Sequence, residues 1–111
     1  MPLRDLSNLS ISRNHYEMVC SLLGKFVPDA EVWAYGSRVN GDGHEASDLD
    51  LVVRNLFDPG LENSHLFDLK DAFVESNLPI RVDVMDWARI PVDFQNEIEK
   101  SYVVLQKGKE N

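Results

Sequence analysis

The feature that most constrains the fold is the short link between two strand-like segments. Glu31–Tyr35 (EVWAY) is apolar and aromatic, and Asp48–Val53 (DLDLVV) is a second run of strand character. The loop Gly36–Ser47 between them contains three glycines, and the link from Ser37 to Ser47 has eleven residues. A parallel crossover normally needs a dozen or more residues. The sequence therefore predicts that these two strands are antiparallel.

Helical and strand periods alternate along the rest of the chain. A helix is predicted from an N-cap at Ser12 to about Phe26, and Pro28 prevents its continuation. Ile80–Met85 alternates apolar and polar residues and predicts a third strand. Two further helices are predicted from apolar residues at helical spacing. They are a helix ending near Asn77, after a turn around Asp58-Pro59-Gly60, and a final helix marked by Phe94, Ile98, Tyr102 and Leu105.

This order predicts an α/β (α+β) domain with a small mixed sheet flanked by helices. The elements run helix, strand, loop or short helix, strand, helix, strand, helix. Because a helix joins the second and third strands, these two can be parallel. A chain of 111 residues fits one domain, 1–111, with loose ends expected at 1–8 and 107–111.

Composition bears on the partners and the compartment. The chain has 19 acidic and 11 basic residues, a net charge of −8, which disfavours direct binding to nucleic acid. A single cysteine, Cys20, allows no internal disulfide. Met1–Leu9 contains no apolar run like a signal peptide, and no stretch reaches transmembrane length. We expect a cytoplasmic protein without a membrane partner.

Two acids alternate along the second predicted strand. Side chains two apart on a strand face the same way, so Asp48 and Asp50 project from one face with Cα atoms roughly 6.5 Å apart. On the third strand Asp83 is out of phase with its apolar neighbours and could join them if the strands are adjacent. Hard cations prefer oxygen ligands. The three carboxylates therefore predict a site for Mg²⁺ or Mn²⁺.

Phosphate-binding groups are expected beside these acids. If the first two strands are antiparallel, Gly36 and Ser37 lie next to Asp48. Glycine allows close approach of a ligand to the backbone, and Ser37 offers a hydroxyl with the amides that follow it. Arg38 adds a positive charge at the same place. Together with the acids, these groups predict a site for a metal-bound polyphosphate.

The combined motif resembles a known signature. The run Ala34-Tyr35-Gly36-Ser37-Arg38, followed by Asp48-Leu49-Asp50-Leu51 and later by Arg81-Val82-Asp83-Val84, is similar to that of the polymerase-β-like nucleotidyltransferase superfamily. The brevity of the chain and its Gly-Ser-Arg and Ser-Asp-Leu-Asp-Leu forms most resemble the minimal nucleotidyltransferase (MNT) family. The resemblance extends from Glu31 to about Trp87.

The resemblance implies an activity and a role for each residue. Asp48 and Asp50 would hold the metal ions that carry ATP, and Asp83 would complete one metal site and help to deprotonate the acceptor hydroxyl. Gly36 and Ser37 would hold the β- and γ-phosphates. Many MNT proteins are antitoxins paired with an all-helical HEPN ribonuclease toxin, and some adenylylate a tyrosine of that toxin. The implied function is therefore Mg²⁺-dependent transfer of a nucleoside monophosphate to a hydroxyl of a HEPN partner.

Several alternatives stay open. Asp48 and Asp50 could be solvated acids of an exposed strand, and Asp83 could face solvent and pair with Arg81 or Lys70. Asp86 is expected to cap the turn at Trp87 rather than bind a ligand. At the level of function, the chain could neutralise its toxin by binding alone. A small-molecule nucleotidyltransferase is a third interpretation, although such enzymes normally need a further substrate-binding domain.

Overall fold

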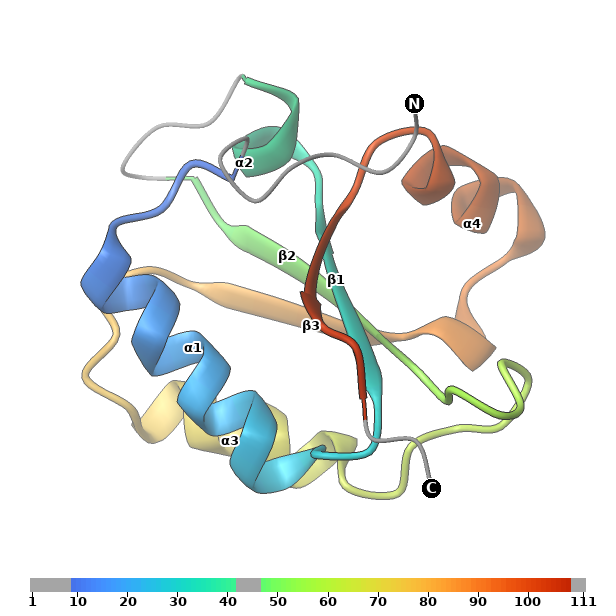
Figure 1. The fold of residues 1–111 in the computed structure, drawn as a ribbon, viewed down its shortest axis with the longest axis horizontal. Coiled ribbons are helices and arrows are strands. Elements are labelled where there is room, and N and C mark those ends of the chain that lie inside the picture. Colours follow the sequence, from blue (N-terminus) through green and yellow to red (C-terminus); the bar gives the residue numbers. More distant parts are fainter. Residues whose placement is uncertain (1–8, 42–46, 109–111) are drawn as a thin grey trace.

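A four-stranded sheet with helices on both faces forms the molecule (Figure 1). The computed structural model describes residues 9–41 and 47–108. Its elements are α1 (Arg13–Phe26), β1 (Glu31–Tyr35), α2 (Ser37–Asn40), β2 (Leu49–Arg54), α3 (Leu66–Glu75), β3 (Val82–Asp86), the 3₁₀ turn η2 (Trp87–Arg89), α4 (Val92–Glu99) and β4 (Val103–Gln106). The predicted fold class, a small mixed sheet flanked by helices, is confirmed.

The sheet has the strand order β3-β2-β1-β4. β1 and β2 are antiparallel, as their short link predicts, and β2 and β3 are parallel on either side of α3. The expected boundaries shift slightly, because Asp48 precedes β2, and Ile80 and Arg81 precede β3. None of the helices within the described ranges has the length and apolar character needed to cross a bilayer.

The predicted final helix is wrong beyond Glu99. α4 ends there, and Val103–Gln106 forms β4, which pairs antiparallel with β1. Two tertiary contacts favour the strand: Tyr102 stacks on Trp33 at 4.0 Å between ring centroids, and the Gln106 side-chain amide donates to the carbonyls of Val27 and Ala30. Adjacent β-branched residues also favour a strand. The apolar residues whose spacing suggested one helix therefore belong partly to α4 and partly to β4.

Two apolar clusters lie on opposite faces of the sheet. Leu49, Leu51 and Val53 of β2 belong to the cluster under α1 and α3. Val52 belongs to the second cluster, which contains Trp33, Tyr35, Trp87, Ile90 and Ile98 under η2 and α4. Because side chains alternate along a strand, Asp50 lies on the second face with Val52. The fold therefore leaves one acid of β2 on the face that α4 only partly covers.

Local signals explain where several elements begin. The Ser12 hydroxyl accepts a hydrogen bond from the His15 amide, which confirms Ser12 as the N-cap of α1. Asn55 and Asp58 accept backbone hydrogen bonds in the predicted turn before α3. Of the expected loose ends, Lys107 and Gly108 are described, whereas residues 1–8 and 109–111 lie outside the described part, as do loop residues 42–46.

Candidate active site

The acids of β2 and β3 are direct neighbours across the sheet. Asp50 is paired in register with Tyr35 of β1 on one side and with Asp83 of β3 on the other. Neighbouring strands lie about 4.8 Å apart, and residues in register project from the same face. Tyr35, Asp50 and Asp83 therefore form one row across three strands. Asp48 lies two residues before Asp50, and both Asp48 and Asp83 are exposed.

Charge and burial act together on this row. Burial raises the pKa of the half-buried Asp50 carboxyl, and the carboxylates of Asp83 and Asp48 raise it further. Burial, followed by the charges of Asp50 and Asp83, also raises the pKa of the Tyr35 hydroxyl. That hydroxyl donates to the sulfur of Met85 at 3.4 Å. The row thus concentrates negative charge that a bound cation would offset.

Gly36 is fitted against Asp50. It follows β1 directly and has φ +84°, a conformation that favours glycine. A Cβ at this position would lie 2.5 Å from Asp50 Oδ2. The Gly36 carbonyl accepts the amides of Val39 and Asn40, so the chain turns into α2 immediately beside the acids. Gly36 was predicted to lie next to Asp48 and is found against Asp50, whereas the place of Ser37 beside the acids stays a prediction.

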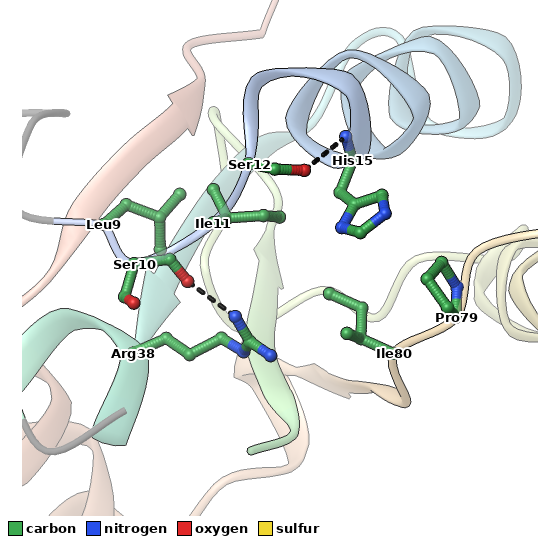
Figure 2. A pocket seen from close by; sticks show the side chains of 8 residues that line it. All are labelled: Leu9, Ser10, Ile11, Ser12, His15, Arg38, Pro79 and Ile80. Carbon is green, nitrogen blue, oxygen red and sulfur yellow. Dashed lines mark hydrogen bonds between the residues drawn. The ribbon is translucent and has the colours of Figure 1, made fainter. Parts of the chain in front are cut away.

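The side chain of Arg38, on α2, donates hydrogen bonds to backbone carbonyls. Its side chain is buried, its Nε donates to the Ser47 carbonyl at 2.9 Å, and an Nη donates to the Ser10 carbonyl at 2.6 Å (Figure 2). The Ser10 amide donates in turn to the Arg38 carbonyl. Arg38 therefore ties together the segments that precede α1 and β2, a role that sequence reasoning missed. Its contact with phosphates stays a prediction.

Replacing Arg38 by lysine separates these two roles. Lysine keeps the charge but cannot reproduce the planar fork, so Arg38→Lys is expected to lower the unfolding free energy by about 1–2 kcal/mol. That corresponds to a melting temperature lower by roughly 5–10 °C without any ligand. Arg89→Lys, at an exposed arginine, is the control and should change little. An unchanged melting temperature for Arg38→Lys would show that Arg38 does not hold the two segments.

A cavity of about 810 Å³ adjoins Arg38 (Figure 2). It lies between the start of α1 and the segment before β3, and its lining includes His15, Arg38 and Ile80. Asp48, Asp50 and Asp83 are not among its lining residues. This cavity is therefore not the place where the acids meet.

The three acids Asp48, Asp50 and Asp83 have side chains of the kind that binds a hard cation. All three predicted ligands offer carboxylate oxygens, the donors that Mg²⁺ and Mn²⁺ prefer. In the part of the chain that the structure describes, no three His, Cys, Asp or Glu side chains form a ready metal-binding group. Asp48, Asp50 and Asp83 are thus close neighbours rather than a preassembled set of three ligands. The donor set fits the predicted ion, and the metal assignment stays a prediction.

The alternatives for the neighbouring acids have different outcomes. No ion pair of Asp83 occurs among residues 9–41 and 47–108, so its suggested pairing with Arg81 or Lys70 is not formed. Asp86 accepts from the Ala88 amide, which confirms the predicted cap, and its second oxygen accepts from the Asn63 amide. Asp83 is therefore available to act with Asp50, whereas Asp86 is engaged in holding the turn.

Known protein families, sequences and structures include several that are similar to this chain. The model of the family described as "Polymerase beta, Nucleotidyltransferase" matches residues 28–111. The Haemophilus influenzae protein "Probable protein adenylyltransferase MntA" is 43% identical over 101 residues, which cover 91% of this chain and 87% of that protein. A solved structure described as "Crystal structure of the toxin-antitoxin with AMP-PNP" has a TM-score of 0.65 and 21% identity, covering 85% of this chain and 74% of its own, and this likeness concerns the fold.

Proposed function

Because the chain belongs to the minimal nucleotidyltransferase family of the polymerase-β-like superfamily, we propose that it transfers AMP from ATP to a hydroxyl of a partner toxin and thereby acts as an antitoxin. The observation that carries this proposal is the row in which Asp50 pairs with Asp83 while Gly36 lies against the Asp50 carboxylate. The carboxylate oxygens could bind a metal ion, and the glycine would let a phosphate group come close to the backbone beside them.

In this reaction the residues have distinct roles. Asp48 and Asp50 would hold Mg²⁺, or Mn²⁺, and Asp83 would share one ion. Metal ions in such a site neutralise the triphosphate and stabilise the attacking and departing oxygens. Gly36 and Ser37 would bind the β- and γ-phosphates, with Arg38 as a further positive group.

The chemistry is a single displacement. The acceptor oxygen forms a bond to the α-phosphorus while the bond from that phosphorus to the bridging oxygen breaks. Pyrophosphate leaves, and the acceptor proton passes to the Asp83 carboxylate. Asp83 suits this step because its side chain is exposed at the end of the row, whereas Asp50 is half-buried between two strands.

ATP and a toxin partner are favoured by the relatives. The Haemophilus influenzae relative is named as a protein adenylyltransferase, and the fold neighbour is described as a toxin–antitoxin with AMP-PNP. The family resemblance favours a HEPN ribonuclease as the toxin. The strongly acidic chain, with a net charge of −8, favours a protein acceptor over a nucleic acid.

A transfer assay tests the proposal. The chain is incubated with ATP labelled at the α-phosphate, Mg²⁺ and the protein encoded by the adjacent gene. We expect label on that protein, released pyrophosphate in equal amount, and loss of both with EDTA. Mass spectrometry should find AMP on a hydroxyl side chain. A tight complex with a neutralised toxin but no label would instead favour an antitoxin that acts by binding alone.

A further inference from the structure

β3 is an edge strand whose outer side carries backbone groups for another strand. Within the described ranges its strand partner is β2, at the end of the order β3-β2-β1-β4. The Leu49 amide donates to the Arg81 carbonyl at 2.9 Å. Because the backbone groups of a parallel strand alternate in direction, the N–H and C=O of Val82 and Val84 then point away from β2. Such an edge can template a further strand.

A groove runs beside this edge. It has a volume of about 460 Å³, lies between α3 and β3, and includes Val74, Leu78, Val82 and Asp83 in its lining. Val74 is 79% exposed, so its apolar side chain is open to a partner. The groove therefore offers apolar contacts on the α3 side and reaches an acid of the candidate active site on the other.

The row of Tyr35, Asp50 and Asp83 determines which side chain of an added strand would lie beside Asp83. Tyr35, Asp50 and Asp83 are in register on three successive strands. The residue of a further strand that pairs with Asp83 would project from the same face, about 4.8 Å from it between strands. Residues on either side of that position would project toward α3 and Val74. One register of the added strand thus places a single side chain at the end of the acid row.

We propose that the acceptor segment of the partner protein binds the outer edge of β3 as an additional strand, with its hydroxyl residue paired beside Asp83. This inference rests on the proposed function, since it assigns how the same site receives its acceptor. The segment is extended, alternates apolar residues toward α3, and carries a tyrosine, serine or threonine next to Asp83. Lys70 and Arg81 also line the groove, which favours acidic residues near that hydroxyl.

A polypeptide fits this edge better than a nucleic acid. Only a peptide backbone supplies alternating donors and acceptors at the spacing of Val82 and Val84. A phosphate backbone would approach a chain of net charge −8 against repulsion. The proposal therefore excludes an RNA acceptor at this groove, and labelled RNA in the transfer assay would overturn it.

Val82 provides a matched pair of variants. Val82→Pro and Val82→Ala both reduce the side chain's contacts, but only proline removes the outward N–H, and edge strands tolerate proline. At subsaturating acceptor, Val82→Pro should label the partner about tenfold more slowly than Val82→Ala, as expected for one lost backbone hydrogen bond. The rise in melting temperature with Mg²⁺ and ATP should be equal in both variants. Equal labelling by the two variants would overturn the edge assignment.

Crosslinking gives an independent measurement in a chain with the edge intact. Val74 is replaced by the photoreactive p-benzoylphenylalanine, and the complex is irradiated with Mg²⁺ and ATP present. The captured peptide should contain the AMP-bearing residue or lie within a few residues of it. The same probe at Val92, exposed on α4, should not capture that peptide. Capture of a remote segment, with normal labelling, would refute binding of the acceptor at the β3 edge but not the transferase function. No labelling by the wild type would refute both.

Discussion

Asp50→Asn is expected to reduce transfer of AMP by at least about a hundredfold, because it removes a charge aimed at the triphosphate's metal ions. The fold should survive, since asparagine has nearly the same size. Asp83→Asn should also abolish transfer yet retain more binding of the metal–nucleotide complex, because Asp48 and Asp50 remain. Labelling of the partner with α-labelled ATP measures transfer, and Asp29→Asn, at an exposed acid outside the row, is the control.

Without metal, Asp50→Asn should stabilise the protein at neutral pH. The pKa of Asp50 is raised in the fold, so the folded state holds its proton more tightly than the unfolded state. The stability that the wild type gains from this tighter proton binding is fully present below the ordinary carboxyl pKa, about 4. It is lost as the pH rises through the raised pKa of Asp50. In EDTA, Asp50→Asn should therefore melt higher than the wild type at pH 7, with the difference disappearing in acid.

Metal and nucleotide should reverse that order. A ligand at a hundred times its Kd stabilises the folded state by about 2.7 kcal/mol, or roughly 10–20 °C for a domain of this size. The wild type should gain this shift from Mg²⁺ and ATP, and Asp50→Asn should gain far less. Na⁺ at matched ionic strength is the control, because screening alone relieves a chain of net charge −8. If Na⁺ acts like Mg²⁺, and mutant and wild type respond alike, the acids do not form a metal site.

Local patterns predicted part of the arrangement of Asp48, Asp50 and Asp83. The length of the loop after Tyr35 makes β1 and β2 antiparallel, and the helix between β2 and β3 makes those strands parallel. Asp50 and Asp83 each alternate with apolar residues in their own strand, and they meet because β3 pairs with β2 in register. Period and loop length therefore give the direction of the strands and the face of each acid, whereas the pairing of β2 with β3 is a property of the whole sheet.

Contacts between distant segments account for what the sequence did not reveal. β4 depends on Tyr102 stacking against Trp33 and on Gln106 reaching the end of α1, neither of which leaves a periodic signal. Arg38 follows the Gly-Ser pair and was predicted to face phosphates, yet it also holds Ser10 and Ser47. A buried arginine in a short loop-like segment signals such a tie only once its neighbours are known.

Gly36→Ala should both destabilise the fold and disable the site. The new Cβ would lie 2.5 Å from Asp50 Oδ2, and the alanine would have to adopt φ +84°. The backbone conformation, φ +84° with ψ −156°, costs any residue but glycine roughly 1–3 kcal/mol, and overpacking a further 1–3. The melting temperature should fall by at least about 8 °C. Transfer should fall by at least about a hundredfold, since a displacement near 1 Å at a reacting centre has that effect.

Two other glycines serve as reference positions for the alanine substitution. Gly41 has φ +89° and ψ −1°, and a Cβ added there would meet none of the described atoms within 4 Å, so Gly41→Ala measures the cost of a left-handed backbone without a close contact. Gly24 lies within α1 with open space around it, and Gly24→Ala should stabilise the helix by about 0.5–1 kcal/mol. Gly36→Ala should therefore cost clearly more than Gly41→Ala.

A double-mutant cycle identifies the group that Gly36 accommodates. In an Asp50→Ala background the carboxylate is gone, so Gly36→Ala should cost clearly less than it does in the wild type. The coupling between positions 36 and 50 then equals the penalty of the close contact. Thermal unfolding in EDTA measures it without interference from metal or nucleotide. Additive effects at the two positions would mean that glycine is required there only for its backbone conformation, and the fit between the loop and the Asp50 carboxylate would have to be abandoned.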